Sequence, residues 1–202
     1  MRAAALASGD GAKLQGILDA VYFGELPQLE LTAVISPEKD AYVMQRALNA
    51  GIPAYVVDPD LFPTMTTHSM AVANKLKDMD VELVILADYG VSLGVIPYQF
   101  KNRIIGTCPR LCPAFEDCEG DVCEAVLERG CRITGATSFF ADGDGGVGCI
   151  IDQKAVAVAD GDTPQTLAQR VTQEAEWLLL TEAVKAFSAG RIAVRAGKLI
   201  RL

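Results

Sequence analysis

Histidine is nearly absent from this sequence, since His68 is the only one among 202 residues. Histidine is the side chain that most often carries protons at neutral pH, so its scarcity limits the acid-base chemistry available. His68 stands at the start of a helix that we expect to run to about Asp78. We therefore interpret His68 as a solvated capping residue rather than a catalytic one.

Long hydrophobic runs are also lacking. No apolar stretch approaches the roughly 20 residues that a membrane span requires. The N-terminal run from Ala3 to Ala7 is broken by Gly9 and Asp10, which predicts a first buried strand rather than a signal peptide. We expect a soluble, cytoplasmic protein without a membrane partner.

Basic residues are too few for a polyanion-binding surface. The chain has 18 Lys and Arg against 26 Asp and Glu, which gives a formal net charge of -8. Nucleic-acid binding needs clustered positive charge, so we expect no nucleic-acid partner. A small anionic ligand is still compatible with this charge, because backbone N–H groups at a helix N-terminus can bind phosphate.

Six cysteines are present, and four of them gather in one stretch: Cys108, Cys112, Cys118 and Cys123. Without a secretory signal, reduced thiols are the better interpretation than a disulfide framework. The spacings of four, six and five positions do not match a C-x-x-C zinc pattern. We expect no metal, with small buried apolar residues as the favoured interpretation and a metal or thiol site at these four cysteines as the alternative.

The N-terminal segment has the pattern strand, glycine turn, helix. An apolar run from Met1 to Leu6 is followed by Ser8-Gly9-Asp10-Gly11-Ala12-Lys13, and apolar residues then recur at helical spacing. Glycines allow close approach of a ligand, and the helix start offers free N–H groups beside the lysine charge. The turn fits a phosphate, and it equally fits a tight turn without a ligand.

Strands and helices then alternate, which predicts a doubly wound, mostly parallel α/β sheet with helices on both faces. The most hydrophobic strand, Val81 to Ala87, is followed by Asp88-Tyr89-Gly90 at the end where such sheets bind ligands. Ala141 to Gly148 is expected to be a flexible loop, and Cys149 to Val158 another strand.

The C-terminal part predicts a long helix and a hairpin. Thr163 is an expected N-cap, with Pro164 at the first position of a helix that continues to about Ser188. The tail from Ile192 to Leu202 is expected to form a hairpin that turns at Ala196-Gly197. We found no repeat and no linker, so residues 1–202 are expected to form a single domain.

The segment Ile104 to Pro113, I-I-G-T-C-P-R-L-C-P, lies where an α/β enzyme would keep its reactive groups, yet it contains no histidine, carboxylate or amide. Together with many other motifs in the same order, it resembles glycinamide ribonucleotide formyltransferase over essentially the whole chain. The motifs are S-G-D-G-A-K-L-Q at 8–15, V-I-S-P near Val34, A-G-I-P at 50–53, L-V-I-L-A at 83–87, C-P-R-L-C-P-A-F at 108–115, E-A-V-L-E-R-G at 124–130, G-A-T at 135–137, D-T-P-Q-T-L at 162–167 and E-A-E-W-L-L at 174–179.

The resemblance implies formyl transfer from 10-formyltetrahydrofolate to the amine of glycinamide ribonucleotide. It places the substrate phosphate on the first glycine loop and the folate cosubstrate in a pocket after the fourth strand. The family uses an asparagine, a histidine and an aspartate to polarise the formyl group, carry a proton and orient the histidine. A formyltransferase-like fold, purine biosynthesis and a phosphorylated small-molecule partner follow from the same resemblance.

The positions that match these three catalytic side chains hold different residues. Gly106 stands at the asparagine position, Cys108 at the histidine position and Gly146 at the aspartate position. Asp144 lies two residues before Gly146 and is a candidate weak substitute for the missing carboxylate. We therefore expect the standard formyltransferase activity to be weak or absent.

The binding positions are retained in part. The resemblance assigns Gly9, Gly11, Ala12, Lys13 and Glu176 to the substrate, and Asp88, Tyr89, Gly90, Val91, Asp142 and Gly143 to the folate cosubstrate. Because the catalytic positions are replaced while several binding positions are retained, the alternative is a non-catalytic nucleotide-binding, folate-binding or regulatory protein. The oligomeric state is open, with a homodimer among the alternatives.

Overall fold

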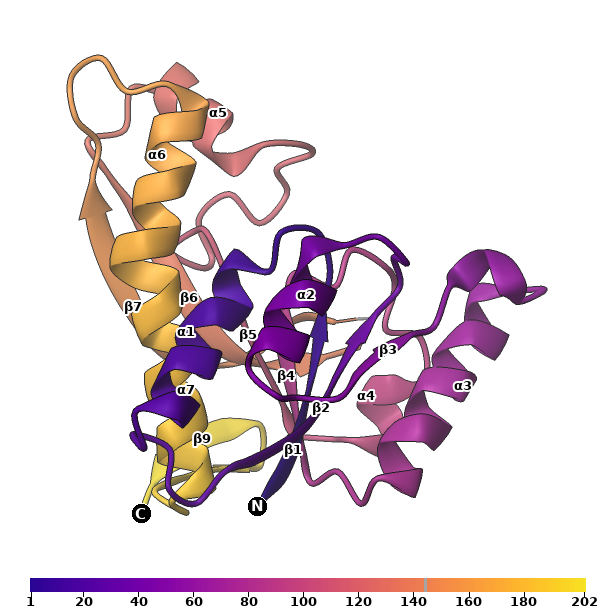
Figure 1. Ribbon diagram of the computed structural model, residues 1–202. Coiled ribbons are helices and arrows are strands. Elements are labelled where there is room, and N and C mark those ends of the chain that lie inside the picture. Colours follow the sequence, from indigo (N-terminus) through magenta and orange to yellow (C-terminus); the bar gives the residue numbers. More distant parts are fainter. Residues whose placement is uncertain (144) are drawn as a thin grey trace.

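The computed structural model describes residues 1–143 and 145–202, and seven of its strands form one sheet in the order β3-β2-β1-β4-β5-β6-β7 (Figure 1). The first five strands of this order pair in parallel, whereas β6 pairs antiparallel with both β5 and β7. The predicted mostly parallel, doubly wound sheet is confirmed. The strands are β1 (Arg2–Ala7), β2 (Glu30–Ser36), β3 (Ala54–Val56), β4 (Leu83–Ala87), β5 (Ile104–Cys108), β6 (Ile133–Asp142) and β7 (Gly146–Ala157).

The helices follow the predicted alternation, and the C-terminal hairpin is also confirmed. Its strands are β8 (Ile192–Arg195) and β9 (Lys198–Arg201), joined through Ala196-Gly197. No helix in the described part of the chain has the length and apolar character needed to cross a membrane. The helices are α1 (Ala12–Tyr22), α2 (Tyr42–Asn49), the 3-10 helix η1 (Pro59–Leu61), α3 (Met65–Asp78), α4 (Ile96–Gln99), α5 (Val122–Glu128), α6 (Pro164–Val171), the π-helical segment η2 (Thr172–Glu176) and α7 (Trp177–Ser188).

Strand β1 shows how the sheet is buried on both faces. Its alternate residues Ala3 and Ala5 pack in one core with α1, α2 and α7, whereas Ala4 and Leu6 pack in a second core with α3 and α4. Successive side chains of a strand point to opposite faces, so a strand covered on both sides must be apolar throughout. Helices on both faces of the sheet are therefore confirmed.

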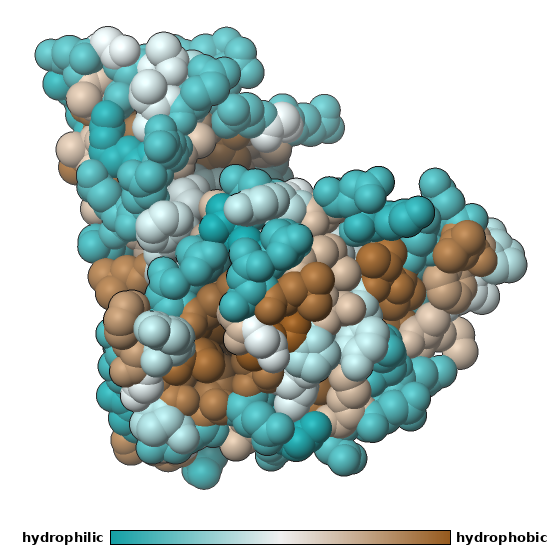
Figure 2. Space-filling view, in the orientation of Figure 1, coloured by the Kyte–Doolittle hydropathy of each residue, from teal (hydrophilic) through white to brown (hydrophobic). Residues whose placement is uncertain are grey.

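A third core lies under α5 and α6 at the antiparallel end of the sheet, where Val126 and Leu167 pack on Ala136 and Val156. Figure 2 shows that this upper part of the molecule is mostly hydrophilic outside, whereas apolar side chains gather lower on the same face. The upper part also stands apart from α2 and β3 across a notch in the surface (Figures 1 and 2).

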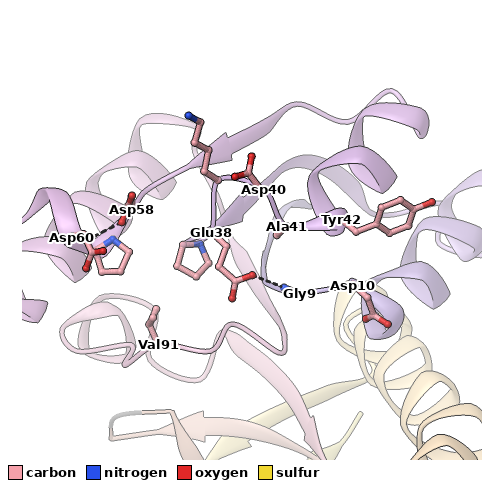
Figure 3. Close-up of a pocket in the computed structure, with 12 residues that line it drawn as sticks. Gly9, Asp10, Glu38, Asp40, Ala41, Tyr42, Asp58, Asp60 and Val91 are labelled. Atoms are coloured by element: carbon pink, nitrogen blue, oxygen red, sulfur yellow. Dashed lines mark hydrogen bonds between the residues drawn. The ribbon is translucent and has the colours of Figure 1, made fainter.

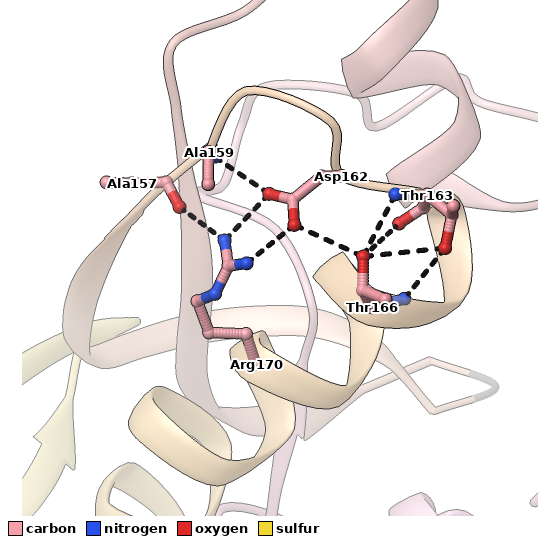
Figure 4. Close-up of polar contacts among 6 residues, drawn as sticks. All are labelled: Ala157, Ala159, Asp162, Thr163, Thr166 and Arg170. Carbon is pink, nitrogen blue, oxygen red and sulfur yellow. Dashed lines mark hydrogen bonds and ion pairs between the residues drawn. The ribbon is translucent and has the colours of Figure 1, made fainter.

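The long C-terminal helix begins at the predicted N-cap. The Thr163 hydroxyl oxygen accepts a hydrogen bond from the Thr166 N–H at 3.2 Å, and the Thr166 hydroxyl oxygen accepts one from the Thr163 N–H at 2.9 Å. Asp162 accepts two bonds from the Arg170 guanidinium and one from the Ala159 N–H, as Figure 4 shows. This capping box and ion pair fix the direction of α6, η2 and α7. The helix in turn positions Glu176, which lies at the end of η2.

Replacing Asp162 by Asn is expected to lower stability at pH 5 but not at pH 2. Hydrogen bonds from Arg170 lower the pKa of the Asp162 carboxyl from 3.8 to about 2. A lowered pKa stabilises the fold above pH 3.8, and this contribution is lost as the pH falls toward 2. Urea unfolding at several pH values should therefore show the gap between wild type and Asp162→Asn closing between pH 4 and pH 2. A gap that stays constant across this window would contradict the assignment.

Two expectations were wrong. Most of Ala141 to Gly148 is strand rather than flexible loop, because β6 and β7 pair as far as Asp142 opposite Gly146. His68 is fully buried rather than solvated, with its Nε2 atom 2.8 Å from the Val57 carbonyl oxygen and its ring stacked on Tyr89. The face of α3 that carries His68 packs against the sheet, so its burial outweighs a surface capping role.

Candidate active site

The candidate site lies where the strand order reverses, at the carboxyl ends of β1 and β4, which is the usual ligand position in open α/β sheets. Ser8 at the end of β1 donates a hydrogen bond to the Asp88 carbonyl oxygen at the end of β4. Gly11 precedes α1 with φ of +68°, and a Cβ atom there would lie 2.6 Å from Val43 Cγ2. The turn therefore requires glycine both for its left-handed backbone and for the close approach of α2.

Carboxylates of the chain itself occupy backbone donors of this glycine loop. The Gly9 N–H donates to Glu38 Oε2 at 3.1 Å, and the Ala12 N–H donates to Asp10 Oδ1 at 2.9 Å. The Ala12 N–H belongs to the set that the N-terminus of α1 would offer to a phosphate, and the Gly9 N–H lies in the turn that precedes this helix. An anionic ligand would have to displace Glu38 from Gly9 to use that donor.

A cleft of about 670 Å³ opens beside the loop. Figure 3 shows Glu38 directed toward Gly9 and Asp58 beside Asp60 across the cleft. The potential in the cleft is negative, because its lining carries five carboxylates and one lysine. These charged residues are Asp10, Glu38, Asp40, Asp58, Asp60 and Lys39.

Lys13 lies buried between two carboxylates. Its Nζ atom is 2.6 Å from Asp88 Oδ1 and 2.7 Å from Glu176 Oε1. Burial would lower the pKa of Lys13, but the charges of Glu176 and Asp88 and their hydrogen bonds outweigh it, so the pKa is raised above 10.5. The Lys13 side chain is 9% exposed and that of Glu176 1% exposed. Two of the five residues assigned to the substrate by resemblance, Lys13 and Glu176, are thus paired with each other.

Glu176 is also held by two hydroxyl groups. Thr107 at the end of β5 donates to Glu176 Oε1 at 3.2 Å, and Thr172 donates to Glu176 Oε2 at 3.0 Å. Both carboxylate oxygens therefore have partners from different parts of the fold. The network joins α1, β5 and η2 around one buried charge, and a ligand hydroxyl would have to share these oxygens.

Gly106 lies buried in the middle of β5, opposite Leu86 of β4 and Phe139 of β6. A Cβ atom on Gly106 would approach Leu86 Cβ to 3.2 Å, so the space that a larger residue needs is partly filled. Position 106 offers no side-chain hydrogen-bond donor. A carbonyl oxygen placed there would lack the stabilisation that an amide provides.

Cys108 ends β5 beside Cys112, and their sulfur atoms are 3.4 Å apart. Burial raises the pKa of the Cys108 thiol to about 12, and the hydrogen bond to Cys112 and the charge of Cys112 add to the effect. The Arg110 charge opposes this shift but does not outweigh it. The Cys108 thiol is therefore protonated at neutral pH and is a poor base and a poor nucleophile.

Cys118 and Cys123 do not join this pair in a metal centre. Cys123 is buried in the third core, and burial raises the pKa of its thiol to about 11. In the part of the chain that the structure describes, no three Cys, His, Asp or Glu side chains are arranged to hold a metal ion. Of the four cysteines in the alternative metal set, the structure brings Cys108 and Cys112 into contact.

A smaller cleft of about 260 Å³ lies at the ends of β4 and β5. It brings together four of the predicted folate positions, Asp88 to Val91, with Thr107 and Gly145. The Tyr89 hydroxyl is buried without a hydrogen-bond partner among the described residues. Asp142 and Gly143 lie at the end of β6 and in the turn before β7, and neither lines this cleft. Gly146 begins β7, and Asp144 lies outside the described residues.

Sequence reasoning missed the residues that hold the Cys108–Cys112 loop. Thr137 Oγ1 donates to the Arg110 carbonyl oxygen at 2.7 Å and accepts from the Cys112 N–H at 3.0 Å. Gln153 Nε2 donates to the Cys112 carbonyl oxygen at 2.9 Å. The sequence signal for Thr137 was its place in the G-A-T motif, but nothing in the sequence marked Gln153.

Comparison with known proteins gives consistent matches over the chain. The family described as formyl transferase matches residues 1–184. The chain is 32% identical over 203 residues to the trifunctional purine biosynthetic protein adenosine-3 of Gallus gallus and 31% identical over 199 residues to that of Bos taurus. These matches cover 98% of this chain in both cases but 20% and 19% of the relatives, so the chain spans about a fifth of their length.

Solved structures agree with this assignment. Glycinamide ribonucleotide transformylase 1 from Symbiobacterium toebii is 36% identical, with a TM-score of 0.92 over 100% of this chain and 94% of that one. Phosphoribosylglycinamide formyltransferase from Coxiella burnetii is 29% identical, with a TM-score of 0.91 over 100% and 93%. The family match covers residues 1–184, which include the seven-stranded sheet, the glycine loop and most of the long C-terminal helix. This chain belongs to the formyl transferase family.

Proposed function

We propose that this chain, taken as one formyltransferase-like domain over residues 1–202, carries out the formyl transfer of glycinamide ribonucleotide formyltransferases weakly or not at all. What supports the proposal is that the sequence has Gly106, Cys108 and Gly146 at the positions that the resemblance matches to the catalytic asparagine, histidine and aspartate of the family. The ancestral reaction would pass formyl from 10-formyltetrahydrofolate to the amine of glycinamide ribonucleotide, as part of purine biosynthesis.

The chemistry explains why these positions matter. Attack of an amine on the formyl carbon builds negative charge on the formyl oxygen, which needs hydrogen-bond donors, and the amine must lose a proton. Gly106 offers no side-chain donor, and the Cys108 thiol, with its pKa raised to about 12 by burial, does not accept a proton near pH 7. Asp144 as a substitute carboxylate stays a prediction.

The folate cosubstrate fits only in part. The cleft lined by Asp88, Tyr89, Gly90 and Val91 has a volume of about 260 Å³. Ligand sites for drug-sized molecules are about 300–1,000 Å³, so the cleft would hold one ring system rather than a whole folate. A whole folate would also need the surface toward Asp142 and Gly143.

The direct test measures formyl transfer from 10-formyltetrahydrofolate to glycinamide ribonucleotide by the purified chain. A relative with its asparagine, histidine and aspartate intact serves as the control. Each lost acid-base group costs about a hundredfold to ten-thousandfold, so the expected rate lies at least about ten-thousandfold below the control. A rate within tenfold of the control would refute the proposal.

A second candidate function is non-catalytic binding of a phosphorylated ligand, as a nucleotide-binding or regulatory protein. The glycine loop with its left-handed Gly9 and Gly11 supports it, since such turns present backbone N–H groups to phosphate. Glu38 opposes it, because this residue of the β2–α2 connection accepts the Gly9 N–H with its carboxylate. Calorimetry with glycinamide ribonucleotide and with a folate separates the two functions, and absence of binding to both would exclude this candidate.

Replacing Glu38 by Gln is expected to strengthen the binding of a sugar phosphate. The carboxylate lies 3.1 Å from the Gly9 N–H, so it both occupies the donor and repels a second anion. Removing its charge should lower the Kd for ribose 5-phosphate at least about tenfold, which corresponds to about 1.4 kcal/mol. Calorimetry at low ionic strength measures the change.

Asp60→Asn is the matched control, because Asp60 lines the same cleft as Glu38. The hydrogen bond of Asp60 runs from its backbone N–H to Asp58, whereas the Glu38 carboxylate bonds to the glycine loop. Asp60→Asn should change the Kd less than Glu38→Gln does. Equal effects of the two variants would assign the repulsion to the cleft as a whole.

A cytoplasmic location and a homodimer stay predictions.

A further inference from the structure

Cys108 and Cys112 form a close pair of thiols that the family chemistry does not use. Their sulfur atoms are 3.4 Å apart, with one thiol donating a hydrogen bond to the other, and both are free cysteines. A disulfide bond is about 2.05 Å long, so the two sulfur atoms need to approach by about 1.4 Å. Closure therefore requires the two side chains to rotate toward each other.

The backbone around the pair is fixed by polar contacts that do not involve sulfur. Cys108 lies in β5 opposite Thr137 of β6, and Thr137 Oγ1 accepts the Cys112 N–H at 3.0 Å. Gln153 Nε2 donates both to the Cys112 carbonyl oxygen at 2.9 Å and to Thr137 Oγ1 at 3.0 Å. Both cysteines are therefore anchored to the same point of the sheet.

The other cysteines lack this arrangement. Cys123 packs in the third core, and Cys149 makes its sulfur contact with a backbone oxygen, that of Ile150, at 3.8 Å. Within residues 1–143 and 145–202, no second pair of cysteine sulfurs shares a hydrogen bond. Oxidation is thus expected to select Cys108 and Cys112 through geometry.

We propose that Cys108 and Cys112 are a dithiol modification site that a two-electron oxidant of the peroxide class closes into an intramolecular disulfide. One thiol, as its thiolate, attacks a peroxide oxygen and becomes a sulfenic acid, while the leaving oxygen takes a proton and departs as water. The second thiol then attacks the sulfenic sulfur, the S–S bond forms, and the S–OH oxygen leaves as a second water. Two thiols are oxidised, and one peroxide is reduced to two waters.

The charges around Cys108 and Cys112 influence the rate at which a peroxide oxidises them. The groups that act on Cys108 are Cys112, Arg110 and Glu176, and only Arg110 favours the thiolate. With the pKa of Cys108 raised to about 12, the reactive thiolate is scarce at pH 7 and increases about tenfold per pH unit. The site should therefore react slowly at neutral pH and faster in alkaline solution.

The test oxidises the reduced full chain with hydrogen peroxide, blocks the remaining thiols with N-ethylmaleimide, and follows intact mass and peptide maps. The expected result is a loss of two hydrogen atoms, a fall by two in the number of alkylated cysteines from the original six, and one peptide pair joined through Cys108 and Cys112. The rate should rise with pH between 7 and 9.

Two variants sharpen the test. Cys118→Ser removes a cysteine outside the pair and should leave the disulfide and its rate unchanged, whereas Cys112→Ser should abolish it and leave Cys108 as a sulfenic or more oxidised acid. A disulfide that joins other cysteines, a bond between two chains, or oxygen addition to Cys108 in the wild type without loss of two hydrogens would overturn the proposal. The wild-type measurement stands even if Cys112→Ser fails to fold.

Discussion

Replacing Lys13 by Met is expected to lower the free energy of unfolding by about 3–5 kcal/mol, because it leaves a buried carboxylate without a cation. Glu176 is 1% exposed, and Lys13 is its partner at 2.7 Å. Thr107 and Thr172 would still donate hydrogen bonds to the carboxylate, but neither carries charge. Asp88 contributes less to the loss, since its side chain is 59% exposed and water can solvate it.

The control removes both charges. Lys13→Met combined with Glu176→Gln keeps the shape of the site and the hydroxyl contacts but leaves no buried ion, so most of the lost stability should return. Chemical denaturation of the wild type, the single variant and the double variant gives the three values. If the double variant is no more stable than Lys13→Met, an unpaired Glu176 charge is not the cause of the loss.

The same network predicts a pH dependence. The pKa of Lys13 is raised above 10.5, because Glu176 and Asp88 outweigh the effect of burial. A raised pKa stabilises the fold fully below pH 10.5 and ceases to do so as the pH rises through the folded value. The stability of the wild type should therefore fall more steeply above pH 10.5 than that of the double variant. If the stability of the wild type and that of the double variant fall in parallel above pH 10.5, the ion pair of Lys13 does not cause the pH dependence.

Lys13 also shows where sequence reasoning reached its limit. A glycine turn followed by a helix and a lysine was correctly placed after the first strand, because these are local signals. The partner of Lys13 could not be predicted, since Glu176 is far along the chain and the two residues meet only in the folded structure. The sequence indicated a positive charge beside the glycine turn, whereas only the fold shows that two carboxylates, Asp88 and Glu176, pair with it.

The order of strands and helices was predictable for a similar reason. Alternating apolar runs and helical spacing are properties of short segments, and they also fix the parallel sheet once right-handed crossovers are assumed. The glycine-rich stretch near Gly146 was misjudged as a loop, because glycine usually breaks strands. In the structure, Gly148 belongs to β7, where a Cβ atom would lie 2.6 Å from the Phe140 carbonyl oxygen. Glycine here allows close pairing of two strands.

Replacing Gly135 by Ala is expected to destabilise the fold by about 3 kcal/mol or more, through overpacking against backbone atoms. A Cβ atom at Gly135 would lie 2.1 Å from the Lys154 carbonyl oxygen and 2.9 Å from Ala155 Cα. Gly135 pairs with Ala155 in the β6–β7 ladder, so the clash can be relieved only by separating the two strands. Thermal and chemical unfolding measure the loss.

Two glycine variants isolate the cause. Gly16 lies inside α1, and a Cβ atom there would lie 3.5 Å from Trp177 Cβ, which is an ordinary contact. Gly16→Ala should therefore stabilise the chain by about 0.5–1 kcal/mol. Gly130→Ala meets no atom within 4 Å but has φ of +64°, so it should cost about 1–2 kcal/mol for the left-handed backbone alone. If Gly135→Ala costs no more than Gly130→Ala, the close approach of β7 does not require glycine.

The Gly135→Ala variant should also weaken the candidate thiol site, because the same ladder positions Thr137 and Gln153 opposite each other. Their side chains hold the Cys112 backbone at 3.0 Å and 2.9 Å. Strands pushed apart at Gly135 would move this anchor away from Cys108, so peroxide should close the disulfide more slowly in the variant. A folded variant with an unchanged closure rate would show that the loop holds the two sulfurs together without the sheet.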